Sequence, residues 1–386
     1  MISRRLDAFL SNRRCTLLGV GPMSKNCVDA SIELANTFEV PLILIASRRQ
    51  IDAEEFGGGY VNNWSTERFS DYVIDQDRKG KVILARDHGG PWQNDTERDD
   101  MLSLRRAMES AKQSFKADIE SGFEIIHIDT CVDIHGTPSA DEVLERAFEL
   151  YEFCWSIAQR CDREVMFEVG TEEQTGTTNT QEELEYTLSS LFNFCKKNKL
   201  PSPSFVVVQT GTRVMEMRNV GSFDSPVRVV GELPAEIQVP KMIDICNKFN
   251  IKMKAHNTDY SSSEALAWHP RLGIHSANVA PEFGVAESRA FIELLSQNKM
   301  DSLVDDFINL SFESKKWKKW MLPNGNATDN DRAVIAGHYV FSSPEFVEIK
   351  KTAKHDLELK GIDLDEYLKD SLKTSIMRYL TNFRLI

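Results

Sequence analysis

The segment Val82-Ile-Leu-Ala-Arg-Asp87-His88-Gly89-Gly90-Pro91 indicates how the chain folds. An apolar run typical of a buried strand stops at an acid, an imidazole and two glycines, which allow a ligand to approach the backbone closely. Similar runs alternate with helix-length amphipathic segments from about residue 16 to residue 299. Strict alternation predicts a parallel sheet, and eight such units predict closure into a (β/α)8 TIM barrel of the α/β class. The predicted strands are Thr16–Pro22, Pro41–Ser47, Lys81–Asp87, Glu124–Asp129, Glu164–Val169, Ser204–Gln209, Ile251–His256 and Ile274–Val279.

Polar side chains follow most of these strands. In a parallel barrel the carboxyl ends of all strands lie on one rim, where active sites are found. Besides Asp87 and His88, the residues at these ends are Ser24, Lys25, Asn26, Ser47, Arg48, Asp129, Glu168, Gln209, His256, Asn278 and Glu282. The sequence therefore predicts a functional site at this rim.

The composition excludes several classes of protein. Of the 386 residues, 41% are hydrophobic and 27% are charged, as in soluble globular proteins, and no apolar run approaches the roughly 20 residues of a membrane span. A net charge of −13 argues against nucleic-acid binding, which needs a basic surface. The seven cysteines show no CxxC or zinc spacing, and the N-terminus lacks an export signal, so we expect a cytoplasmic protein with reduced thiols.

Beyond about residue 300 the pattern is helical only. We therefore divide the chain into a barrel (1–299) and a helical C-terminal extension packed on it (300–386). The basic-aromatic patch Lys315–Trp320 is interpreted as an amphipathic helix whose tryptophans pack on the barrel, rather than as a nucleic-acid or membrane contact. The long connection Thr210–Pro234 is typical of a lid, a binding loop or a partner contact. Together these two surfaces favour a homo-oligomer.

Two histidines suggest a metal site. His88 and His256 each end a strand, four strands apart, so they face each other across the barrel mouth. With Glu168, and with the amide oxygen of Gln209 as a further donor, they form a set typical of a catalytic divalent metal. Zinc is expected, while Mn, Co and Ni stay open because ligand type does not separate them. The alternative is two hydrogen-bonded rim histidines without metal, and His127 is interpreted as a buried core histidine.

The carboxylates of the rim suit proton transfer. Asp87, Asp129 and Glu168 are the predicted catalytic acids and bases, with Glu172, Asp259 and Glu282 as further candidates. A metal acting as a Lewis acid on a carbonyl or hydroxyl would allow enediolate or retro-aldol chemistry on a ketose, a sugar phosphate or an activated sugar. A Schiff base on Lys254 or Lys25 is the competing mechanism.

Substrate contacts are predicted along the same rim. Ser24, Lys25 and Asn26 lie at a helix N-terminus, a favourable place for an anion, and Arg48, Arg49 and Arg213 offer positive charge. Gln209, Asp259 and Glu282 complete the predicted substrate-binding set. Because no P-loop or GxGxxG motif occurs, a nucleotide cofactor is not expected.

The chain also resembles the family of the non-catalytic subunit of class II tagatose-bisphosphate aldolase. The matching segments occur in the family's order across about residues 55–295. They are Phe56–Tyr60, Asp87–Pro91, Ala107–Ser110, Ile126–Asp129, Glu168–Glu172, Val208–Gln209 and Ala255–Tyr260.

This resemblance implies a TIM barrel related to the class II aldolases, with His88 and His256 as ligands of a divalent metal, usually zinc, and Asp87 as acid/base. Members of the family are metal-dependent epimerases of ketose phosphates or ketouronates, or partners that stabilise a separate catalytic aldolase subunit. Gln209 stands where the aldolases have another histidine ligand, and Asn257–Tyr260 replaces their phosphate loop, which implies a different sugar. We therefore expect an epimerase or aldolase-type lyase; the alternative is a non-catalytic aldolase subunit.

Overall fold

A computed structural model describes residues 2–170, 180–224 and 234–386. Eight parallel strands close into a barrel in the order β1-β10-β9-β6-β5-β4-β3-β2, which confirms the predicted TIM barrel. Each strand lies within two residues of its predicted limits. The strands are β1 (Leu17–Val20), β2 (Leu42–Ser47), β3 (Val82–Gly89), β4 (Ile125–Asp129), β5 (Met166–Gly170), β6 (Phe205–Val208), β9 (Lys252–Ala255) and β10 (Ser276–Val279).

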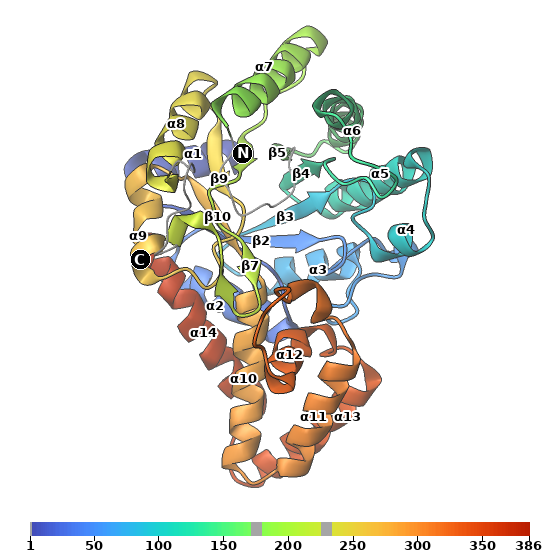
Figure 1. Cartoon of the computed structure of the whole chain (residues 1–386), viewed down its shortest axis with the longest axis vertical. Coiled ribbons are helices and arrows are strands. Elements are labelled where there is room, and N and C mark those ends of the chain that lie inside the picture. Colours follow the sequence, from blue (N-terminus) through green and yellow to red (C-terminus); the bar gives the residue numbers. More distant parts are fainter. Residues whose placement is uncertain (1, 171–179, 225–233) are drawn as a thin grey trace.

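Helices surround the barrel, and the sequence marks where several of them begin (Figure 1). Ser65 caps one helix, and Ser139 and Thr180 form capping boxes with Glu142 and Glu183, so backbone N–H groups without helical partners are satisfied. The helices of this part are α1 (Ile2–Asn12), α2 (Lys25–Phe38), α3 (Thr66–Gln76), α4 (Asp95–Asp99), α5 (Leu104–Ser121), α6 (Ala140–Arg160), α7 (Gln181–Asn198), α8 (Ala235–Lys248), α9 (Ser263–Leu272) and α10 (Pro281–Gln297).

The C-terminal helices form a second hydrophobic cluster against α10 and then return to the barrel. Helices α11 (Asp301–Glu313), α12 (Asp329–Ala336) and α13 (Pro344–Glu358) gather at one end of the molecule, whereas α14 (Leu364–Asn382) packs on α2 and α10 (Figure 1). Three side chains of α14, Leu372, Ile376 and Tyr379, belong to the main core cluster. The division at residue 300 and the predicted homo-oligomer stay predictions. No helix among the described residues has the length and apolar character to cross a membrane.

The basic-aromatic patch differs from the sequence-based interpretation. Only a short 3-10 helix, η3 (Lys318–Trp320), forms there, and α11 ends before the patch. Trp317 stacks on Phe312 of α11, while the Trp320 backbone carbonyl accepts a hydrogen bond from the Glu216 N–H. Glu216 joins the small antiparallel hairpin of β7 (Val214–Met215) and β8 (Arg218–Asn219) within the long connection, whose residues 225–233 lie outside the described residues.

Close contacts require glycine at two consecutive positions at the end of β3, Gly89 and Gly90. A Cβ atom on Gly90 would lie 1.9 Å from the carbonyl oxygen of Asp129, and one on Gly89 would lie 2.3 Å from the Phe115 ring. Because the Asp129 carbonyl is backbone at the end of β4, it cannot move aside without moving the strand end. Glycine at these two positions therefore allows the carboxyl ends of β3 and β4 to lie as close together as they do.

We expect Gly90→Ala to destabilise the protein by roughly 1–3 kcal/mol, the usual effect of overpacking, and to displace Asp129. Urea unfolding followed by circular dichroism measures this loss. Gly136→Ala is the matched control, because no atom lies within 4 Å of a Cβ at that position and φ there is not positive. Equal stability of the two variants would contradict the prediction.

Candidate active site

A β-bulge in β3 places two consecutive side chains in the same cavity. The register of β3 on β4 shifts, so that Arg86 pairs with Ile126 but Gly89 pairs with Ile128. His88 takes up the extra residue with a left-handed φ of 47°, which is unusual for a residue other than glycine. In a regular strand neighbours point to opposite faces. The bulge instead allows both Asp87 and His88 to line the cavity.

The two predicted rim histidines meet. The Nε2 atoms of His88 and His256 lie 3.1 Å apart. On the far side of the first ring, His88 Nδ1 lies 2.6 Å from a carboxylate oxygen of Asp129, which also accepts a hydrogen bond from Gln93. His256 Nδ1 is 3.3 Å from the side-chain amide of Gln209. Each imidazole is therefore oriented through Nδ1, leaving its Nε2 atom facing the other ring.

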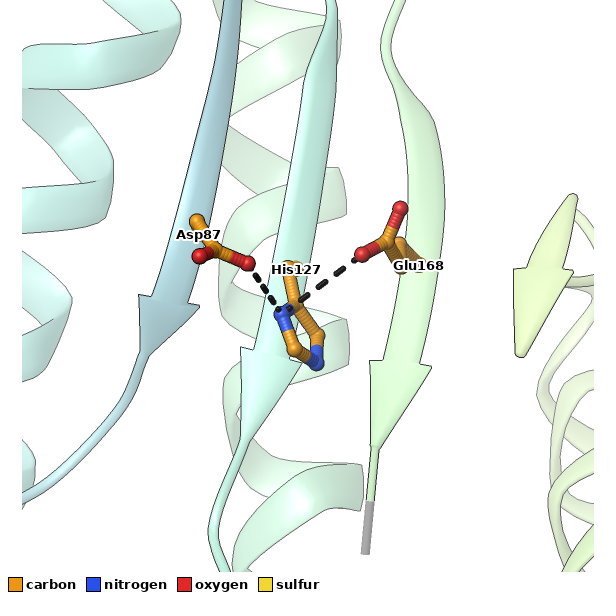
Figure 2. Close-up of side chains that lie close together, drawn as sticks. All are labelled: Asp87, His127 and Glu168. Atoms are coloured by element: carbon orange, nitrogen blue, oxygen red, sulfur yellow. Dashed lines mark hydrogen bonds and ion pairs between the residues drawn. The ribbon is translucent and has the colours of Figure 1, made fainter. Parts of the chain in front are cut away.

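Below this pair lies a second cluster of ionisable groups. Its side chains come from the neighbouring strands β3, β4 and β5 and from β9. Figure 2 shows His127 of β4 between Asp87 of β3 and Glu168 of β5. His127 Nδ1 is 3.3 Å from Asp87 and 3.6 Å from Glu168. Both Glu168 oxygens are bound by the Lys254 ammonium group of β9, at 2.9 and 2.8 Å. The sequence-based interpretation of His127 as an ordinary core histidine therefore missed its contact with two acids.

Neighbouring charges shift the pKa values of His88, His256, Asp87 and Asp129 in opposite directions. Burial alone would lower the pKa of His88, but Asp87 and Asp129 raise it to about 9. Burial also opposes ionisation of those two acids, yet the neighbouring imidazoles, led by His88, hold the pKa of each carboxyl well below its usual range. His256 behaves in the opposite way, because burial and the His88 charge lower its pKa to about 3. The site thus pairs a cationic and a neutral imidazole with two carboxylates.

A cavity of about 370 Å³ opens above these residues. Four of the predicted catalytic or metal-binding residues line it: Asp87, His88, Asp129 and His256. This volume falls in the range of small-molecule sites. Glu168 does not line the cavity, because its carboxylate is held below the rim by Lys254.

The predicted substrate contacts lie elsewhere and have structural partners. Ser24 and Asn26 both donate to the buried Glu287 of α10, and Lys25 pairs with Asp29 on the surface. Ser24 and Asn26 are therefore tied to a neighbouring helix, and of the residues after β1 it is Met23 that lines the cavity. Gln209 contacts His256 and acts on the cavity only through that ring.

The prediction that Arg48 contacts the substrate is also corrected, because Arg48 has structural partners. Its guanidinium is buried and contacts Asp52, Glu97 and the hydroxyl of Ser110, whereas the next residue, Arg49, lines the cavity. The residues Asp259 and Glu282 form a second buried structural group, described below. Glu172, a further catalytic candidate, lies outside the described residues.

Sequence reasoning also missed one wall of the cavity. Lys319, Trp320, His338 and Tyr339 of the C-terminal extension line it, facing Tyr60 from the loop after β2. The only signal was the basic-aromatic patch itself, whose tryptophans were expected to pack on the barrel exterior. A strand-end pattern cannot identify residues that reach the rim from a distant helical segment.

Two sets of donor atoms come close enough together to hold a divalent metal. Asp87, His127 and Glu168 offer atoms within 4.8 Å of one another, a spacing that an ion could use. However, the Lys254 ammonium already takes the cation's place beside Glu168, and His127 Nδ1 accepts the His88 backbone N–H. The facing Nε2 atoms of His88 and His256 fit better, because Asp129 orients the first ring through its other nitrogen, as carboxylates do for ligating histidines. On the side of this pair, an oxygen of Asp87 lies 3.8 Å from His88 Nε2.

Asp259 and Glu282 hold the loop after β9 against α10 and α14. Asp259 accepts hydrogen bonds from the backbone N–H groups of Ala280 and Glu282, and the Glu282 side chain accepts from Tyr379 of α14. Burial and the Glu282 carboxylate raise the pKa of Asp259 to about 7. The folded state therefore binds a proton that an unfolded aspartate, with a pKa of about 4, releases.

This raised pKa predicts that the stability falls with rising pH. The stabilising contribution of the protonated Asp259 is complete below about pH 4 and is lost as the pH rises through 7. We expect Asp259→Asn to remove that loss, making the variant more stable than the wild type at pH 8 by on the order of 1 kcal/mol. Denaturant unfolding from pH 5 to 8 measures the effect, with the exposed Asp100→Asn as control. Parallel pH profiles for all three proteins would rule out the assignment.

Comparisons with known proteins agree with the barrel. Residues 7–197 match the model of the D-tagatose-1,6-bisphosphate aldolase subunit GatZ/KbaZ-like family. Curated GatZ subunits of Escherichia coli O157:H7 and Shigella boydii serotype 18 are each 27% identical over 169 residues, or 41% of this chain. The match spans 37% of the length of these relatives, little more than a third.

Solved structures share the fold over nearly the whole chain. A probable tagatose 6 phosphate kinase from Sinorhizobium meliloti 1021 has a TM-score of 0.70 at 16% identity, covering 95% of this chain and 100% of that one. The fructuronate-tagaturonate epimerase UxaE from Cohnella laeviribosi has a TM-score of 0.58 at 13% identity, covering 96% and 81%. At these identities the likeness is one of fold. The family match covers residues 7–197, just under half of the chain, and this part of the chain is similar to the D-tagatose-1,6-bisphosphate aldolase subunit GatZ/KbaZ-like family.

Proposed function

We propose that this protein is a metal-dependent carbohydrate enzyme that converts a ketose or a sugar phosphate, most directly by epimerisation. The observation that carries the proposal is the facing pair His88 and His256, 3.1 Å apart at Nε2, in one cavity with the carboxylates Asp87 and Asp129. We place it in the cytoplasm, because none of the seven cysteines forms a disulfide.

The metal would be held by His88 and His256. Bound there, a divalent ion supplies Lewis-acid polarisation of a carbonyl or hydroxyl oxygen. Zinc suits the two imidazoles, with open positions left for substrate, and the same ligands accept Mn, Co or Ni; Asp87 stays outside the ligand set as the base. A metal at Nε2 would replace the proton that the cationic His88 ring carries there, while Asp129 would keep the other proton on Nδ1 because its carboxylate accepts it.

Asp87 is the group proposed to move the proton. It lines the cavity, and the surrounding positive charge keeps it ionised, so it begins as a base. In the enediolate route it takes the proton from the carbon beside the carbonyl, whose electrons move into the enediolate, and a proton later returns to the other face. In the retro-aldol route it takes a hydroxyl proton while the adjacent C–C bond breaks, and re-addition to the other carbonyl face inverts the centre.

The remaining predicted groups support this base. Glu168 binds Lys254 with both oxygens and lies 3.6 Å from His127, so we assign it a positioning role. The same ion pair argues against a Schiff base on Lys254, because its ammonium group is 1% exposed and does not line the cavity.

The second candidate function is a subunit that binds and stabilises a catalytic class II tagatose-bisphosphate aldolase. The family description favours it, since the matched proteins are named as aldolase subunits. In that case the same residues would bind a ligand without turning it over.

Deuterium incorporation distinguishes these functions. The metal-loaded protein alone is incubated in deuterated water with ketoses, ketose phosphates and nucleotide sugars. Label at a carbon-bound position indicates proton abstraction, and epimerisation without label indicates retro-aldol cleavage. We expect Asp87→Asn to slow turnover by roughly 10²–10⁴-fold, the usual contribution of a general base. No turnover by the isolated chain, together with increased activity of a co-purified aldolase, would favour the subunit function.

Metal content is a separate prediction. We expect elemental analysis of protein purified without chelator to find a divalent metal, and His88→Ala to lower its occupancy. His355→Ala is the control, because that histidine is exposed on α13, away from the cavity. Equal metal content in both variants, or none in the wild type, would refute these ligands.

A further inference from the structure

We propose that the cavity wall formed by the C-terminal extension binds an anionic end group of the substrate, a phosphate or a carboxylate, through Lys319 and Arg49. This inference rests on the proposed function for the identity of the substrate as a sugar, but not for the binding of the anion. Arg49 comes from the loop after β2, Lys319 from η3, and both line the cavity that holds His88 and His256.

The balance of charge at this wall favours an anion. Asp95 pairs with Arg49 at 2.7 Å and with Lys316 at 3.4 Å, so one carboxylate faces two cations there. Among the residues that the structure describes, no carboxylate lies within 4.0 Å of the Lys319 ammonium group. Positive charge is therefore in excess beside the cavity, although the chain as a whole carries a net charge of −13.

Aromatic rings hold Lys319 without neutralising it. Its Nζ atom lies 4.9 Å from the centroid of the Trp320 ring and 5.2 Å from that of Tyr339. Cation–π contacts restrict the ammonium group, while its N–H donors stay available to a ligand oxygen. The Lys319 side chain stays accessible to a ligand, and its pKa is lowered by partial loss of hydration and then by the Arg49 charge, although Asp95 acts in the opposite direction. A bound anion would offset this clustering of like charges.

The wall is joined to the barrel by several contacts. The indole N–H of Trp320 donates to the Tyr339 hydroxyl at 3.3 Å, and the Ser342 hydroxyl donates to the Tyr60 carbonyl at 2.7 Å. The Glu216 N–H donates to the Trp320 carbonyl at 2.6 Å, linking η3 to the β7–β8 hairpin. Because the extension, the loop after β2 and the hairpin are tied together, Lys319 occupies a defined place in the cavity.

The cavity offers different residues to the two ends of a bound sugar. Arg49 lines the same cavity as the imidazole pair and Lys319. A sugar whose carbonyl end reaches His88 and Asp87 would thus direct its other end toward Arg49 and Lys319. The helix N-terminus at Ser24 cannot serve this purpose, since Ser24 is bonded to Glu287.

Titration calorimetry with inorganic phosphate tests the inference without turnover. We expect the wild type to bind phosphate and Lys319→Met to bind it at least roughly tenfold more weakly, about 1.4 kcal/mol. Lys319→Arg keeps the charge and should keep binding. Lys318→Met is the matched control, because the adjacent lysine is equally exposed but does not line the cavity. A melting curve for each variant verifies folding.

Parallel titrations with D-glucuronate distinguish a carboxylate from a phosphate end group. Whichever anion the wild type binds more tightly is the expected end group. No binding of either anion, or equal binding by the wild type and Lys319→Met, would overturn the inference. If phosphate binding is lost in Lys319→Met but the protein shows no deuterium exchange with any sugar, the anion site stands and the enzymatic function fails. If Lys319→Met binds phosphate as tightly as the wild type but the wild type exchanges deuterium into a sugar, the anion site fails and the enzymatic function stands.

Discussion

The buried ion pair between Lys254 and Glu168 is the constraint around which the upper barrel is arranged. Each side chain is 1% exposed, and removing either would leave an uncompensated charge in the interior. The pair links β9 to β5 across β6, and Glu168 continues the contacts to His127, which in turn reaches Asp87. A polar layer therefore crosses the barrel where most TIM barrels place branched apolar side chains.

This layer determines which groups are left for chemistry. Because Lys254 satisfies both oxygens of Glu168, that carboxylate is held below the rim. Asp87 is shared between the layer and the cavity: one oxygen lies 3.3 Å from His127 and 3.4 Å from the Asn278 amide, and the other faces His88. The charged floor thus supports one carboxylate in the cavity and keeps it ionised.

The strands could be predicted from sequence because their apolar runs are local and end at polar residues. The bulge in β3 could not. Alternation along a strand would have turned His88 away from Asp87, and only the pairing with β4 shows the extra residue. The placing of both residues in one site was therefore correct for a reason that the sequence pattern did not contain. The same limit explains Arg48 and Arg49, since beyond the end of β2 no periodicity indicates which of two adjacent side chains faces the cavity.

The rest of the cavity depends on contacts between segments far apart in sequence. The residues matched by the family model, 7–197, supply Arg49, Asp87, His88 and Asp129. His256 and the wall residues Lys319 and Trp320 lie beyond that range. The matched half contributes the carboxylates and one imidazole, whereas the other half contributes the second imidazole and the surface facing the far end of a ligand. Both parts of the chain therefore build the cavity, and the wall residues Lys319 and Trp320 lie far in sequence from the charged floor beneath Asp87.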